Sequence, residues 1–163
     1  MSTPVKSSSA DASLREHLLA ALRGGHAHMT FDQCVKGFPV EQAGERPAGL
    51  PHSAWELLEH IRRAQEDILR FSESADYASP AFPDGYWPES QAPASATEWN
   101  ASIRKYRKEL AEFEALILDP RQDLHHPFPW GDGQTLLREA LTIIDHTSYH
   151  LGQLLLVRKL LEG

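Results

Sequence analysis

The stretch TLLREALTIIDHTSYHLGQLLLVRKLLEG, residues 135–163, decides the fold class of this protein. Its apolar residues recur at helical spacing, which predicts one long helix over about 134–161. One apolar stripe lies opposite the face that carries His146 and His150; its members are Leu137, Leu141, Ile144, Leu151 and Leu155. A helix that is apolar on two opposite sides is covered on both. We expect the core of the bundle to cover one side, and either a second subunit or the proline-rich links of the same chain to cover the other.

The rest of the chain also shows helical periodicity, without convincing strand alternation. Three more long helices and one short helix are predicted, over about 13–24, 53–71, 97–118 and 31–37. Ser53 and Glu56 form a capping-box pattern at the start of the second long helix. Thr30 and Thr97 are the predicted N-caps of the short helix and of the third long helix. The fold class is therefore all-α.

The links between the helices predict how they are joined. The link between the second and third long helices is long and contains Pro80, Pro83, Pro88 and Pro93. Such a link is uncommon unless it crosses the length of a bundle or carries function. Long crossovers join parallel neighbours in four-helix bundles. We expect one domain over 13–163, a four-helix bundle with a long crossover between its second and third helices, after a disordered lead-in over 1–12.

Composition excludes several classes of function. The 163 residues include 16 Lys and Arg against 23 Asp and Glu, for a net charge of -7. Phosphate backbones would repel such a chain, so neither nucleic acid nor an anionic membrane is an expected partner. The single cysteine, Cys34, excludes an internal disulfide and a multi-cysteine zinc site. Without a secretory signal or a membrane-spanning run, a cytoplasmic protein is expected.

His146 and His150 are the first candidates for chemistry. At four-residue spacing on a helix, their imidazoles lie about 40° apart on one face. Divalent first-row metals bind imidazole nitrogens readily. The spacing resembles the histidine pair of zincin proteases, but Thr147 stands where their catalytic glutamate would be, which excludes that mechanism. Spacing alone leaves open a second interpretation, in which neighbouring side chains or water satisfy both histidines.

A third ligand should come from another helix, because two histidines leave a zinc-like ion short of ligands. His60 is the best candidate, since it flanks the apolar stripe near the middle of the helix over 53–71. Asp67, two turns further on, either supports the site or is a solvated carboxylate. The remaining histidines are expected at the surface or at the mouth of a cleft: His17, His26, His28, His52, His125 and His126.

Two segments resemble the DinB-like family of four-helix bundles, whose relatives include bacillithiol S-transferases and mycothiol-dependent maleylpyruvate isomerase. They are HSAWELLEHIRRAQEDIL at 52–69 and the stretch at 135–163, and their order and separation also match. The pattern H-x-x-Y-H-x-G-Q in the second segment is the most specific part. The resemblance covers nearly the whole chain after residue 12. It implies that His60, His146 and His150 bind a divalent metal ion.

The resemblance also implies a metal-dependent enzyme that acts on a small molecule, with a thiol S-transferase as the first candidate and a hydrolase as the second. Zinc or nickel is the expected ion, iron or manganese the alternative, and a low-molecular-weight thiol the co-substrate. Three protein ligands leave a position open to water or substrate. Tyr149 and Gln153 either orient a ligand or only pack, and no nucleophile or general base is evident.

Two further expectations concern assembly and the rival function. The second apolar stripe of the last helix predicts a homodimer through that helix, since a two-fold pairing of one patch is the commonest way to bury it. The alternative to an enzyme is a non-catalytic metal- or ligand-binding dimer of the stress response.

Overall fold

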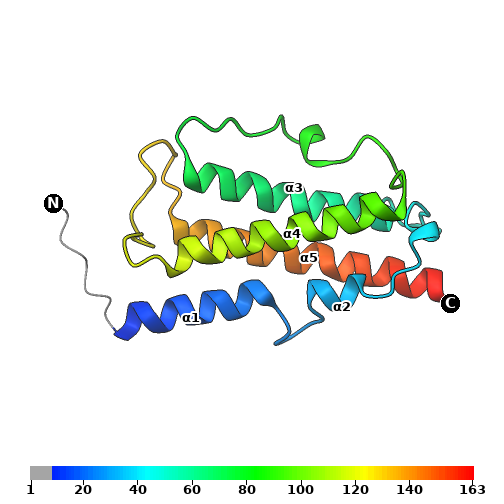
Figure 1. Cartoon of the computed structure of the whole chain (residues 1–163), viewed down its shortest axis with the longest axis horizontal. Helices are drawn as coiled ribbons and strands as arrows, with labels where there is room; N and C mark the ends of the chain where they lie inside the picture. The colour runs from blue at the N-terminus through cyan, green and yellow to red at the C-terminus, as the bar shows by residue number, and fades with distance from the viewer. Residues whose placement is uncertain (1–8) are drawn as a thin grey trace.

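The computed structural model describes residues 9–163 and shows an all-α fold within them (Figure 1). The α-helices are α1 (Ser9–Arg23), α2 (Phe31–Val35), α3 (Ala54–Glu73), α4 (Ala96–Leu118) and α5 (Leu136–Glu162). Two 3-10 helices lie in the links, η1 (Val40–Gln42) and η2 (Asp84–Tyr86). Among the described residues, no helix is both long and apolar enough to cross a membrane.

The helices form the expected bundle. Helix α3 packs against both α4 and α5, while α1 contacts α4 and α5 from the other side. Helices α1 and α2 follow one another along the bundle, so that together they occupy the fourth position (Figure 1). The link between α3 and α4 runs back along the whole length of α3 (Figure 1). The predicted four-helix bundle with a long crossover between the second and third long helices is confirmed.

Two of the three predicted N-cap residues, Thr30 and Ser53, are confirmed. Thr30 and Ser53 each accept a hydrogen bond from the third residue of their helix, and the side chain of that residue bonds back to the cap. The predicted Thr97 cap is wrong. Ser95 caps α4 instead, because its backbone is extended and its Oγ accepts a hydrogen bond of 3.2 Å from the Glu98 amide.

Helix α1 begins at Ser9, so residues 9–12, predicted as part of a disordered lead-in, are helical. The guanidinium of Arg15 explains the extension. It lies 2.9 Å from the Asp11 carboxylate, one turn earlier, and donates a hydrogen bond of 2.7 Å to the Gln122 carbonyl in the link after α4. The first turn of α1 is thereby tied to the end of the bundle. The rest of the predicted lead-in, residues 1–8, lies outside the described residues.

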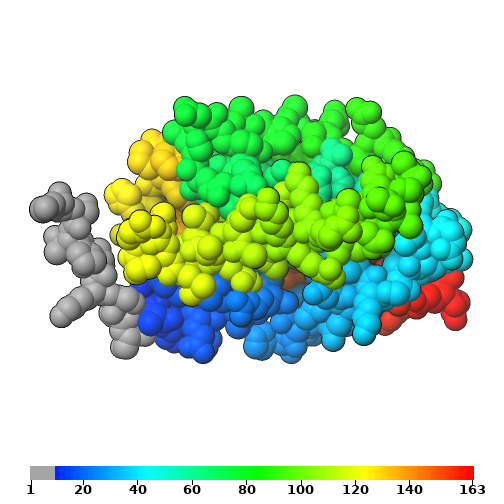
Figure 2. All heavy atoms as spheres, viewed as in Figure 1, coloured from blue at the N-terminus to red at the C-terminus, as the bar shows by residue number. Residues whose placement is uncertain are grey.

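Most of the second apolar stripe of the last helix is covered within the chain, although its member Leu141 is 51% exposed. Leu151 is only 4% exposed, while Leu137, Ile144 and Leu155 pack partly buried against the core. Helices α1 and α2 provide the cover through their contacts with α5. Arg158 of α5 fixes α2 in place, because its guanidinium donates to the carbonyls of Cys34 and Lys36 at 3.0 and 2.8 Å. The space-filling view shows α4, α1 and α2 hiding most of α5 on that face (Figure 2).

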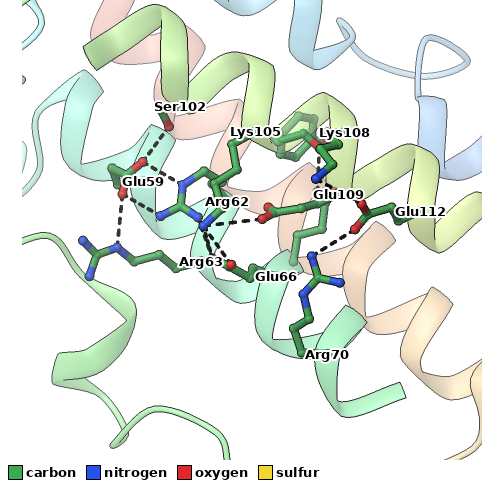
Figure 3. A network of polar contacts seen from close by, with 12 residues as sticks. Glu59, Arg62, Arg63, Glu66, Arg70, Ser102, Lys105, Lys108, Glu109 and Glu112 are labelled. Carbon is green, nitrogen blue, oxygen red and sulfur yellow. Dashed lines mark hydrogen bonds and ion pairs between the residues drawn. The ribbon is translucent and has the colours of Figure 1, made fainter. Parts of the chain in front are cut away.

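Charged side chains line the interface between α3 and α4 (Figure 3). Arg62 of α3 binds the carboxylates of Glu59 and Glu66 at 2.8 and 2.7 Å. Lys105 of α4 pairs with Glu66 at 2.8 Å. Glu109 is different: it is 1% exposed, and neither carboxylate oxygen has a hydrogen-bond partner. Burial, together with the nearby Glu66 carboxylate, raises the pKa of Glu109 to about 7.

Candidate metal centre

Three histidines meet between α3 and α5. His60 comes from the middle of α3, and His146 and His150 come from successive turns of α5. Each offers one ring nitrogen to a group whose ligand atoms all lie within 4.8 Å of one another. The Nε2 atoms of His60 and His146 are 3.0 Å apart. The structure therefore brings together the three residues predicted as ligands.

Hydrogen bonds behind the rings orient two of these histidines. The Nδ1 atom of His60 lies 3.1 Å from the Tyr86 carbonyl, which can only accept, so Nδ1 carries the proton and Nε2 keeps its lone pair. The Nδ1 atom of His150 lies 2.8 Å from the Gln153 amide oxygen, with the same consequence. Metal-binding histidines usually donate their other ring N–H in this way. Gln153 thus holds a candidate ligand, one of the two roles considered for it.

The protonation states also suit a metal ion. Burial lowers the pKa of His60 and of His146 to about 4, with the positive forms of the neighbouring histidines adding to the effect. Burial likewise lowers the pKa of His150. All three imidazoles are therefore neutral at pH 7, which is the form that binds metal. Among the described residues, no cysteine or carboxylate joins the group. An imidazole-only donor set fits zinc, nickel, copper or iron.

The crossover between α3 and α4 forms one wall of the site. The indole of Trp87 stacks on the His60 ring with a centroid distance of 3.8 Å and an interplanar angle of 2°. The His52 ring also stacks on Trp87, at 4.1 Å and 16°. Two rings this close to one indole cannot share a face, so Trp87 lies between His52 and His60. His52 is consequently half-buried beside the site rather than a surface residue.

No sequence pattern predicts the positions of Tyr86 and Trp87, because an irregular link has no periodicity that shows where its side chains point. The hydroxyl of Tyr86 donates a hydrogen bond of 2.7 Å to Asp67. Asp67 is therefore a bonded, half-buried carboxylate, which decides against the solvated alternative. Tyr149, the other candidate for orienting a ligand, is 66% exposed, with its ring edge-on to His150 at 4.9 Å.

The remaining candidates lie apart from the three histidines. His17, His26, His125 and His126 are exposed, as expected. His28 is exposed at a separate cavity of about 140 Å³ between α1, α2, α4 and α5, where its Nε2 lies 3.0 Å from the Ser148 hydroxyl. Cys34 is 1% exposed, and burial raises the pKa of its thiol. A buried neutral thiol is a packing residue rather than a nucleophile.

A family model, that of the DinB superfamily, matches residues 24–154. This range contains the crossover and all three clustered histidines. No curated protein and no solved structure matches the chain significantly.

Proposed function

This chain belongs to the DinB superfamily, and we propose that it binds one divalent metal ion through His60, His146 and His150 and uses that centre on a small molecule. The observation that carries the proposal is the convergence of three neutral imidazoles from two helices within 4.8 Å. The two oriented tautomers support it, since an Nδ1–H bonded to an oxygen leaves Nε2 free to bind metal. In the alternative, neighbouring side chains or water satisfy the histidines, and the convergence of three ring nitrogens from two helices has no role.

The chemistry we propose is that of a thiol S-transferase, with hydrolysis as the second candidate. A divalent ion in this site would act as a Lewis acid and favour ionisation of a small thiol or water at neutral pH. The residues of the chain hold the imidazoles in place, and Trp87 shields the His60 side from water. Three protein ligands leave room for one from outside, as catalytic rather than structural sites do. Zinc and nickel are the first candidate ions, followed by iron and manganese.

The rival proposal is a non-catalytic metal- or ligand-binding protein of the stress response. A turnover assay distinguishes the transferase from this rival. Purified protein loaded with zinc or nickel is incubated with several low-molecular-weight thiols and an electrophilic aryl chloride, and thioether formation is followed by absorbance. Thiol-specific turnover that chelation abolishes supports the transferase. Metal binding with no turnover for any thiol or simple ester supports the rival.

We also propose a homodimer through α5, on a surface that shares only Leu141 with the stripe expected from the sequence. Three leucines of α5 remain at the surface: Leu141 is 51% exposed, Leu156 46% and Leu160 52%, and the last two lie one turn apart. Exposed leucines are unfavourable in water and would be buried by pairing with a second copy. The proposal concerns assembly alone and does not bear on the metal centre.

A further inference from the structure

One face of α3 holds the crossover at the metal centre. His60, Arg63 and Asp67 are spaced three and four residues apart, so they lie on the same side of the helix. Each binds the same short segment. The His60 Nδ1–H donates to the Tyr86 carbonyl at 3.1 Å, and Arg63 Nη1 donates to the Trp87 carbonyl at 3.0 Å. Asp67 accepts from the Tyr86 hydroxyl at 2.7 Å. The segment is thus fixed at three points around a candidate ligand.

The local backbone places Tyr86 where these bonds can form. Tyr86 is the last residue of η2, and the Gly85 amide before it donates to the Ala81 carbonyl at 2.8 Å. A Cβ on Gly85 would lie 2.6 Å from the Cβ of Pro80, too close for any side chain. The glycine therefore lets the chain turn tightly enough to bring both the carbonyl and the phenol of Tyr86 onto α3.

Asp67 connects α3 to the crossover through Tyr86, and its side chain also forms a hydrogen bond with Tyr77. Its carboxylate is half-buried on α3, on the same side as His60. Burial and the hydrogen bond to Asp67 raise the pKa of Tyr86, so the phenol keeps its proton and remains the donor. A carboxylate that accepts from a neutral phenol forms a strong, charge-assisted hydrogen bond. This bond pins the residue whose carbonyl orients His60.

We propose that Asp67 and Tyr86 are positioning residues of the metal centre. Asp67 holds Tyr86, the Tyr86 carbonyl takes the Nδ1–H of His60, and the Nε2 of His60 is thereby kept toward His146. Without the bond between Asp67 and Tyr86, the Tyr86 carbonyl is held less firmly, and the lone pair of His60 points less reliably at the other two imidazoles. The crossover is then a structural part of the site and not merely a connection. This inference rests on the proposed metal binding.

The test is a titration of the full chain with Co²⁺, which gives visible absorption bands that report the ligand geometry. The variants Asp67→Ala and Tyr86→Phe should each raise the Kd for Co²⁺ by about 10-fold or more, as the loss of a supporting partner behind a ligand typically does. Asp67→Asn keeps an oxygen that accepts the hydrogen bond and should restore affinity close to that of the wild type. The control is Asp84→Ala, which removes an exposed carboxylate from the same crossover and should bind Co²⁺ like the wild type.

Circular dichroism of each variant separates positioning from folding. If Asp67→Ala loses its helical signal, Tyr86→Phe tests the positioning role instead, because it removes only one hydroxyl. A wild-type Kd and spectrum in a folded Tyr86→Phe or Asp67→Ala protein overturns the inference and leaves the proposed function intact. A wild-type protein that gives no Co²⁺ bands overturns the proposed metal centre itself, and this inference with it.

Discussion

Replacing Glu109 with glutamine should stabilise the protein at about pH 8 and change its stability little at about pH 4. Glu109 lies between α3 and α4 with 1% of its surface exposed (Figure 3). Both carboxylate oxygens lack a hydrogen-bond partner, and the Lys105 amine is 3.6 Å away. The buried carboxyl therefore favours its neutral form and should lose its proton only as the pH rises through about 7. Other charges that act on it are Glu66, which favours the neutral form, and Arg62 and Arg70, which favour the ionised form.

The sign and size of the change in stability follow from the pKa of Glu109. Burial, with Glu66, raises the pKa of Glu109 from 4.5 to about 7, so the folded chain holds this proton over a pH range where the unfolded chain has lost it. The stabilisation is complete below pH 4.5 and is lost as the pH rises through about 7. The loss amounts to about 3 kcal/mol, because each pKa unit corresponds to about 1.4 kcal/mol. For a domain of this size, that is a difference in Tm of about 6–12 °C.

The assay is thermal unfolding of the wild type and Glu109→Gln at a series of pH values from about 4 to 8. The Tm of the variant relative to the wild type should rise through the series, since glutamine cannot ionise. Glu112→Gln is the matched control on the same helix. Although partial burial opposes it, the hydrogen bond from Arg70 lowers the pKa of Glu112, so the control should gain no stability at high pH. A difference between Glu109→Gln and wild type that stays constant over the series would show that folding does not raise the pKa of Glu109, which refutes the reasoning.

Three other outcomes are expected. Chelating the metal should abolish turnover but leave the helical circular dichroism signal, since the apolar core forms without an ion; loss of that signal would indicate a structural site. Ser53→Ala should lower the free energy of unfolding by about 1 kcal/mol, because the side chain that caps α3 is removed; an unchanged free energy in denaturant unfolding would contradict the contribution of this cap. Leu141→Asp with Leu160→Asp should yield monomers by light scattering from a dimeric wild type, and a monomeric wild type at micromolar concentration contradicts the α5 dimer.

The features predicted correctly from the sequence are those that depend on local pattern. The periodicity of apolar residues located α3, α4 and α5, and the capping box at Ser53 and Glu56 located the start of α3 to the residue. The histidine pair of α5 converges because four-residue spacing on a helix is itself a geometric constraint. His60 could be selected as the third ligand from its position on the flank of an apolar stripe.

The features that the sequence did not predict depend on contacts between distant segments. The early start of α1 depends on Arg15 reaching carbonyls more than a hundred residues away. The burial of Leu151 depends on α1 and α2 folding back over α5, which no local pattern encodes. The role of Tyr86 depends on the path of the crossover. Its proline content predicts an irregular link but not where the link lies.

The most direct test of the metal centre is the metal content of the purified protein and of His60→Ala after both are incubated with zinc and dialysed. We expect one zinc ion per wild-type chain and loss of most of it in His60→Ala, because α3 supplies one of the three converging nitrogens. The exposed His125 and His126 are the controls, and their alanine variants should keep the wild-type content. Full zinc stoichiometry in a folded His60→Ala protein would contradict the three-histidine centre.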